Sequence, residues 1–182
     1  MLDTLRQLLI SQYHAALSTL ASCVAHCPDS LWNAPIAKAP FSQAAFHTLI
    51  FADLYLGRDD ETAFRRQPFH LAHPEFFGDY EQLEYREPVC VYQRAPIMKY
   101  IEFVRDKAAA TLAAESAESL SGPCGLPRRL FSRAELHVYN IRHIQHHSAQ
   151  LILRLRIEHA ADIRWFGAGW TDPPDPPAPP SS

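Results

Sequence analysis

Three of the ten histidines in this 182-residue chain lie within five residues of one another, in the segment RHIQHHSAQL at 142–151. His143 and His147 are four residues apart, so on a helix their side chains leave the same face about 6 Å apart. Two imidazoles at this spacing bind one metal ion in zinc proteases with the HExxH motif. Here no glutamate stands between them, so that motif's general base is missing. His146 lies about 100° around the helix from His147 and would join the pair only through strained rotamers.

A third ligand must come from another helix, and His47 in AFHTLIF is the candidate because apolar residues flank it. A neutral imidazole in an apolar core is costly unless it is hydrogen-bonded or ligated. Three neutral nitrogens leave coordination positions open, as in a catalytic site, and imidazole suits zinc, nickel or ferrous iron. The spacing alone is equally compatible with core histidines that bind no metal.

Two more residues are expected beside these histidines. Gln150, one turn beyond His147, would donate to a metal-bound water or to a histidine ring, or would simply pack in the core. Tyr139 precedes His143 by one turn and would line the site or act as a core aromatic. Asp53 lies six residues after His47, off its face of the helix. The remaining histidines are expected at the surface or in loops, with two of them (70 and 73) nearest the site: His14, His26, His70, His73, His137 and His159.

Helices must position these residues, and apolar periodicity near 3.6 predicts the first over 2–27, where prolines end it. The second is apolar on nearly all sides and should be the most buried helix. It is expected to begin at Ser42, whose hydroxyl can cap a free backbone N–H, and to stop at Gly57.

The third predicted helix covers 95–118, and its proline falls in the first turn, where no helical N–H bond is lost. The fourth carries the histidine pair. It opens with Ser132 and Glu135, which have the spacing of a capping box, and runs to about Ile157.

Two segments fall outside this pattern. Residues 58–93 are rich in aromatics and prolines, and so long a connection is either a lid or wall of a site or a segment that packs over the end of a bundle. Residues 171–182, TDPPDPPAPPSS, are too rich in proline for a helix or sheet, which predicts a disordered tail after a single domain at 1–170.

Composition narrows the class of protein. The formal net charge is −3, and no run of Lys and Arg is present, so nucleic acid is not an expected partner. The four cysteines form no CxxC pair and are expected as reduced thiols of a cytoplasmic protein. Neither a secretory signal nor an uninterrupted apolar run of membrane-spanning length is evident.

The segments YNIRHIQHHSAQL and FHTLIFADLYL resemble the DinB-like superfamily of damage-inducible and bacillithiol-transferase-like proteins. The likeness extends from the first helix to about Leu155. It implies an all-α four-helix bundle of up-up-down-down topology with a long crossover, and one divalent ion (Zn, Ni or Fe) held by His47, His143 and His147. Many members continue the last motif as HRGQ where this chain has HSAQ, so the glutamine is kept and no role of the arginine is implied.

The resemblance also implies a metalloenzyme acting on a small molecule. If the ion activates water, the protein is a hydrolase. If it activates a low-molecular-weight thiol cosubstrate such as bacillithiol or mycothiol, the protein is an S-transferase, and that chemistry needs no protein base. The alternative is a metal-binding scaffold or sensor without turnover. Family bundles commonly pair, so a homodimer through the apolar first helix is expected.

Overall fold

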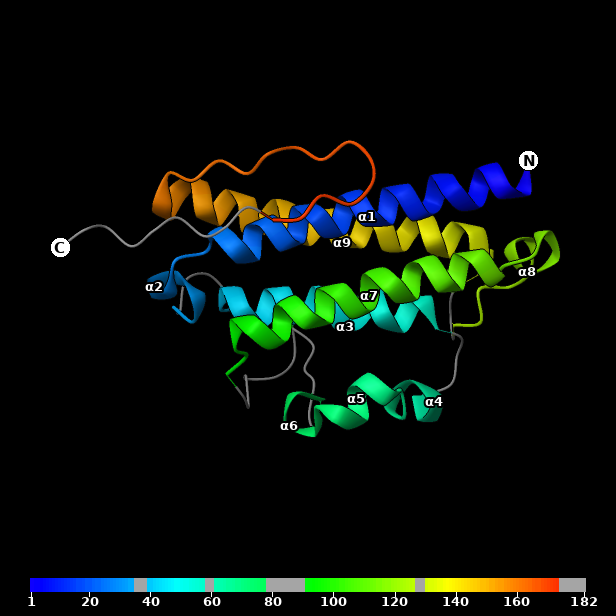
Figure 1. The fold of residues 1–182 in the computed structure, drawn as a ribbon, viewed down its shortest axis with the longest axis horizontal. Helices are drawn as coiled ribbons and strands as arrows, with labels where there is room; N and C mark the ends of the chain where they lie inside the picture. Colours follow the sequence, from blue (N-terminus) through cyan, green and yellow to red (C-terminus); the bar gives the residue numbers. More distant parts are fainter. Residues whose placement is uncertain (35–38, 58–60, 78–90, 127–129, 174–182) are drawn as a thin grey trace.

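The computed structural model describes residues 1–34, 39–57, 61–77, 91–126 and 130–173. Within these ranges the regular secondary structure is helical, which confirms the all-α class (Figure 1). Four long helices pack in a ring in which each contacts two neighbours, in the order α1 (Leu2–His26), α9 (Arg133–His159), α3 (Phe41–Leu56) and α7 (Arg94–Ala114). Short helices occupy the connections: α2 (Asp29–Trp32), α4 (Glu61–Arg65), α5 (Pro68–Ala72), α6 (Pro74–Phe77) and α8 (Ala117–Ser121).

The helix directions differ from the up-up-down-down expectation. In Figure 1, α1 and α9 run one way and α3 and α7 run the other, so the order along the chain is up-down-down-up. The reason lies in the connections. The crossover between α3 and α7 carries the chain back along the bundle, so the two helices that it joins are parallel, whereas the shorter links that contain α2 and α8 each join antiparallel helices.

Helix α3 is the most buried long helix, as predicted, and only His47, Phe51 and Leu54 among its 16 residues are not fully buried. It ends at Gly57 as expected, but the N-cap is Pro40 and not Ser42. Pro40 has an extended backbone, so the helix begins one residue before Ser42, whose hydroxyl instead donates to Asn33 Oδ1 at 2.6 Å. The α3 start is therefore tied to the end of α2.

The predicted third helix is interrupted at Glu115, which separates α7 from α8. Ser116 starts α8 with its own capping box, and the Glu115 side chain turns into the core, where Arg133 Nε donates to it at 2.8 Å. The predicted capping box of α9 is confirmed: Glu135 N donates to Ser132 Oγ, and Ser132 N donates to the Glu135 carboxylate.

Arg133, in the first turn of α9, also fastens the end of α3. Its guanidinium is almost fully buried and donates to the carbonyls of Tyr55, Leu56 and Gly57 at 2.7–3.0 Å. These carbonyls lie at the α3 C-terminus, where intrahelical partners run out. Arg133 thus fixes the α9 N-terminus against the α3 C-terminus and sets how the two helices lie along each other.

The described part of the crossover packs on the side of the bundle formed by α3 and α7 (Figure 1). Phe69 of α5 stacks on Tyr100 and Phe103 of α7, with ring centroids 5.5 and 4.6 Å apart. Residues 74–77 form α6, and residues 78–90 lie outside the described chain. Residues 61–77 therefore cover a side of the bundle.

After α9 the chain returns along α1. Gly169 N donates to Ser11 O at 3.0 Å, and Thr171 N donates to Ser18 Oγ at 2.9 Å. The predicted domain boundary at 170 thus falls inside a segment that contacts α1, and the predicted disordered tail lies mostly at 174–182, outside the described residues.

Helix α1 is long and apolar enough, by length and composition, to cross a membrane. In this structure 67% of its apolar window is buried inside the bundle, and core helices of soluble proteins pass the same test. The burial accounts for the apolar composition of α1.

Candidate metal centre

The three histidines singled out in the sequence converge between α3 and α9. The ring of His47 lies 4.8 Å from that of His147 and 5.8 Å from that of His143, and the two α9 rings are 4.7 Å apart, all between centroids. One ring nitrogen of each residue lies within 4.8 Å of the other two. Among the described residues, no other group of three or more His, Cys, Asp or Glu side chains has an arrangement that could hold a metal ion.

The packing of α9 on α3 explains this convergence. Ile144 and Leu151 point into the core and are fully buried, which places the His143–His147 edge of α9 beside α3. The rings are partly buried at this seam. His146 lies off the seam, is exposed, and bonds Gln150 instead, which agrees with its exclusion from the predicted ligand set.

Two of the three rings carry a buried nitrogen with no partner. His47 Nδ1 and His143 Nε2 are shielded from solvent and make no hydrogen bond. Leaving a buried polar atom unpaired costs about 1–3 kcal/mol, so such atoms in a native protein call for a ligand or another explanation.

The third ring is oriented by Gln150. His147 Nδ1 lies 3.2 Å from Gln150 Oε1, an acceptor, so Nδ1 carries the proton and the Nε2 lone pair is left for a ligand. Gln150 Nε2 lies 3.0 Å from His146 Nε2. Gln150, predicted as a donor beside the site, thus accepts from the His147 ring and meets the His146 ring with its amide nitrogen.

Burial keeps these rings neutral. Loss of solvent, and to a smaller extent the neighbouring histidines, lower the pKa of His47 to about 4 and that of His143 to about 3. The pKa of His147 is also lowered, mainly by burial. Since only a neutral imidazole can ligate a metal, the rings are in the required protonation state near neutral pH.

The spacing of the nitrogens also fits an ion. Nitrogens that ligate tetrahedral zinc at 2.0–2.1 Å lie about 3.3 Å from one another. The ligand atoms here lie within 4.8 Å of one another, so modest side-chain rotations close the remaining gap. The buried unpaired nitrogens, the neutral rings and this spacing all suit a divalent ion.

Aromatic side chains line one end of the site. Phe51 lies 4.7 Å from the His47 ring, and Tyr55 lies 5.8 Å from the His143 ring. Tyr139, the predicted wall residue, packs edge-on against Tyr55 at 5.4 Å. Phe51 and Tyr55 were missed in the sequence, although positions one and two turns after His47 share its face of the helix.

Asp53 lies away from this site, as its position on the helix predicted. It is fully buried and accepts from Tyr100 Oη at 2.8 Å, and Lys107 Nζ bonds its other carboxylate oxygen. Its Oδ2 lies 2.7 Å from His70 Nε2. Burial alone would raise the pKa of Asp53, but the bond from His70 and the charge of Lys107 outweigh burial and lower it.

The expectation that His70 lies near the metal site at the surface or in a loop is therefore wrong. His70 is buried on the α3–α7 side of the bundle, where it stacks on Phe77 at 3.9 Å and pairs with Asp53. His73 stays beside Phe69 of α5, with Nδ1 2.9 Å from the Phe69 carbonyl. The apolar residues around His70 in FHLAHP favoured burial, but its partner is far away in the sequence.

His137 is a second correction, because it is fully buried and not at the surface. Its Nδ1 lies 3.2 Å from Tyr13 Oη, and its Nε2 lies 3.6 Å from the Glu115 carboxylate. It joins α1 to α9 within the core. His159 is exposed as expected, and His14 and His26 are partly buried.

Comparison with known proteins agrees with this architecture. The family model of the DinB superfamily matches residues 12–151, which include all three histidines and most of the bundle. No match was found among curated proteins or among solved structures. The matched segment spans well over half of the sequence, and the chain belongs to the DinB superfamily.

Proposed function

We propose that this protein binds one divalent metal ion (Zn, Ni or Fe) through His47, His143 and His147, and uses it to transfer a low-molecular-weight thiol to a small electrophilic substrate. The observation that carries the proposal is the convergence of three neutral rings, two of which hold buried nitrogens without partners. Three imidazoles leave the ion's charge uncompensated, and a bound divalent ion lowers the pKa of a thiol or water strongly.

Thiol transfer is favoured over hydrolysis by the residues that surround the rings. Within the described chain, the group of potential ligands contains three histidines and no carboxylate. Asp53, on the same helix as His47, is already held by Lys107 and His70. A thiol that loses its proton to solvent needs no protein base, whereas hydrolysis gains from a base that positions and deprotonates water.

The chain's own residues would orient the metal ligands and shape the site. Gln150 holds the His147 tautomer. Such hydrogen bonds fix ring direction and raise ligand basicity. Phe51 and Tyr55 supply an apolar wall on one side, which excludes water from that side and suits an uncharged electrophile.

The test begins with metal content. Elemental analysis of purified protein should find one ion per chain, and His147→Ala should lose it, whereas His159→Ala, an exposed histidine on the same helix, should not. Metal-loaded protein is then offered thiols with electrophiles and, separately, esters and amides. Turnover with thiols that His147→Ala abolishes supports the proposal.

Other outcomes decide between the remaining functions. Ester or amide cleavage that depends on His147 would make the protein a hydrolase. Stoichiometric metal without turnover in either panel would favour a metal-binding scaffold or sensor. Absence of metal, or metal retained in His147→Ala, would refute the site itself.

A further inference from the structure

The metal-binding edge of α9 continues beyond His147 to an arginine. Arg154 follows His147 by seven residues and His143 by eleven, so on an α-helix it projects within about 20° of both. Its Cα lies about 10 Å along the axis from that of His147, at a rise of 1.5 Å per residue. Arg154 therefore lies on the same seam between α9 and α3 as the three histidines.

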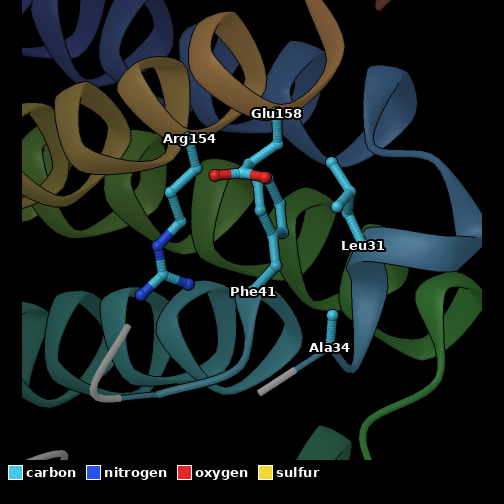
Figure 2. Close-up of a pocket in the computed structure, with 5 residues that line it drawn as sticks. All are labelled: Leu31, Ala34, Phe41, Arg154 and Glu158. Atoms are coloured by element: carbon cyan, nitrogen blue, oxygen red, sulfur yellow. The ribbon is translucent and has the colours of Figure 1, made fainter. Parts of the chain in front are cut away.

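The Arg154 side chain points across this seam. It lines a small cavity with Leu31, Ala34, Phe41 and Glu158, and Figure 2 shows its guanidinium directed from α9 toward α3. The cavity measures about 10 Å³, room for about one water molecule. A larger group that met the guanidinium would therefore lie along the seam and not inside this cavity.

Arg154 forms no ion pair with the residues that the structure describes. It is half-buried, yet no hydrogen bond or ion pair to its guanidinium is formed there. Glu158, one turn further on, borders the same cavity, but no ion pair within 4.0 Å joins the two side chains. By contrast, Arg133 has four bonds to acceptors, and Arg156 pairs with Asp162 at 2.6 Å.

The surroundings leave that charge uncompensated. Burial lowers the pKa of the Arg154 guanidinium, which shows that water solvates it incompletely. Its electrostatic neighbour is the Cys27 thiol, and burial raises the pKa of that thiol to about 12, so it is neutral. A partly desolvated cation without an anion is unfavourable, and an anionic ligand would relieve the cost.

We propose that Arg154 binds an oxyanionic group, a carboxylate or phosphate, of the small molecule whose reacting atom lies at the three histidines. This inference rests on the proposed metal site and adds a substrate class to it. A guanidinium offers a planar pair of N–H donors that matches an oxyanion. Its place along α9 selects an elongated molecule, with its reacting group at one end and its negative charge at the other.

The test compares acids with matched neutral molecules. Protein is loaded with one equivalent of Co²⁺, and ω-mercaptoalkanoates of increasing chain length are titrated against the corresponding amides and phosphonates. The sulfur-to-cobalt absorption band reports binding of each thiol and yields its Kd without any need for turnover. At the best chain length, an anion should bind about tenfold more tightly than its amide, the size expected of a charge-assisted bond.

Variants assign that preference to one residue. Arg154→Gln should bind acid and amide equally, and Arg154→Lys should keep part of the preference. Arg156→Gln is the matched control, because this exposed arginine is two residues away on the same helix, and it should behave like the wild type. The phosphonate arm shows which oxyanion fits better.

Two results would overturn the inference. Equal affinity for acids, phosphonates and amides at every length in the wild-type protein would do so without any variant. A preference that survives in Arg154→Gln would assign it to another cation. Both results leave the metal site standing, whereas a protein that takes up no cobalt would remove the proposed function and this inference together.

Discussion

The metal affinity of this site should depend on pH far less than the affinity of a site made of three solvent-exposed histidines. For ligands of ordinary pKa, about 6.5, each ring loses about tenfold in apparent affinity per pH unit below that value. Three such rings together would lose about 10⁴-fold between pH 7 and pH 5. Proton competition is therefore a sensitive measure of how deeply these rings are buried.

The structure predicts a much smaller loss. Burial lowers the pKa of His47 to about 4 and that of His143 to about 3, so at pH 5 both rings are still at least about nine-tenths neutral. Only His147 can contribute appreciably. With an unshifted pKa, protonation of His147 would lower the metal affinity about 30-fold between pH 7 and pH 5. Because the pKa of His147 is lowered, the loss of affinity is smaller. The affinity should thus fall by less than about 30-fold between pH 7 and pH 5, then steeply below pH 4.

The measurement is Zn²⁺ competition against a chelator of known protonation, with far-UV circular dichroism at each pH to confirm that the protein is folded. A loss of about 10⁴-fold in folded protein would show that the rings titrate as exposed imidazoles, which would refute their burial at the α3–α9 seam. It would also contradict the reading of the buried nitrogens as ligand atoms.

Metal-free protein, the Asp53 cluster and the chain end each carry a further prediction. In the metal-free protein, the folded-state pKa values of His47 and His143 lie below their unfolded values. The free energy of unfolding should therefore be highest above about pH 6.5 and should fall by a few kcal/mol as the pH drops toward these folded-state values, about 4 and 3, as measured by urea titration. Asp53→Asn should cost about 3–5 kcal/mol in the same assay because Lys107 loses its buried partner, yet metal content should be unchanged. Asp29→Asn, which removes the exposed carboxylate of a surface pair with Arg94, should cost less than about 1 kcal/mol. Ending the chain after Trp170 removes the Thr171–Ser18 bond and should cost no more than about 1.5 kcal/mol by thermal denaturation; a larger loss would show that 171–182 contribute more contacts than this.

Features set by near neighbours in the chain were predictable from the sequence. The bounds of α1, the capping box of α9 and the shared face of His143 and His147 depend on residues three or four positions apart. Recognising His47 as the third histidine needed more, namely its apolar surroundings and the family resemblance. Those two signals identified the ring that the structure places beside the other two.

Features set by distant partners were not predictable. His70 and His137 were assigned to loops or the surface because histidine is often exposed, but each meets a partner more than 15 residues away. Ser42 has the residue type of an N-cap, yet the preceding Pro40 sets the helix start and Asn33 takes the hydroxyl. Helix directions likewise follow from which connection crosses the bundle, and that depends on packing and not on local pattern.

The two faces of α3 differ in how completely their polar side chains are bonded. His47 faces α9, where it lies beside the other two histidines. Asp53, six residues further along α3, faces α7 and α5, and residues of both helices bond its carboxylate. The Asp53 carboxylate is held by three donors and so fastens the crossover to the bundle. The histidines with unpaired ring nitrogens, and Arg154 without an ion pair on the same seam, are the polar groups that still lack a bonding partner. On that ground the α3–α9 seam, and not the more polar α3–α7 cluster, is where substrate should bind.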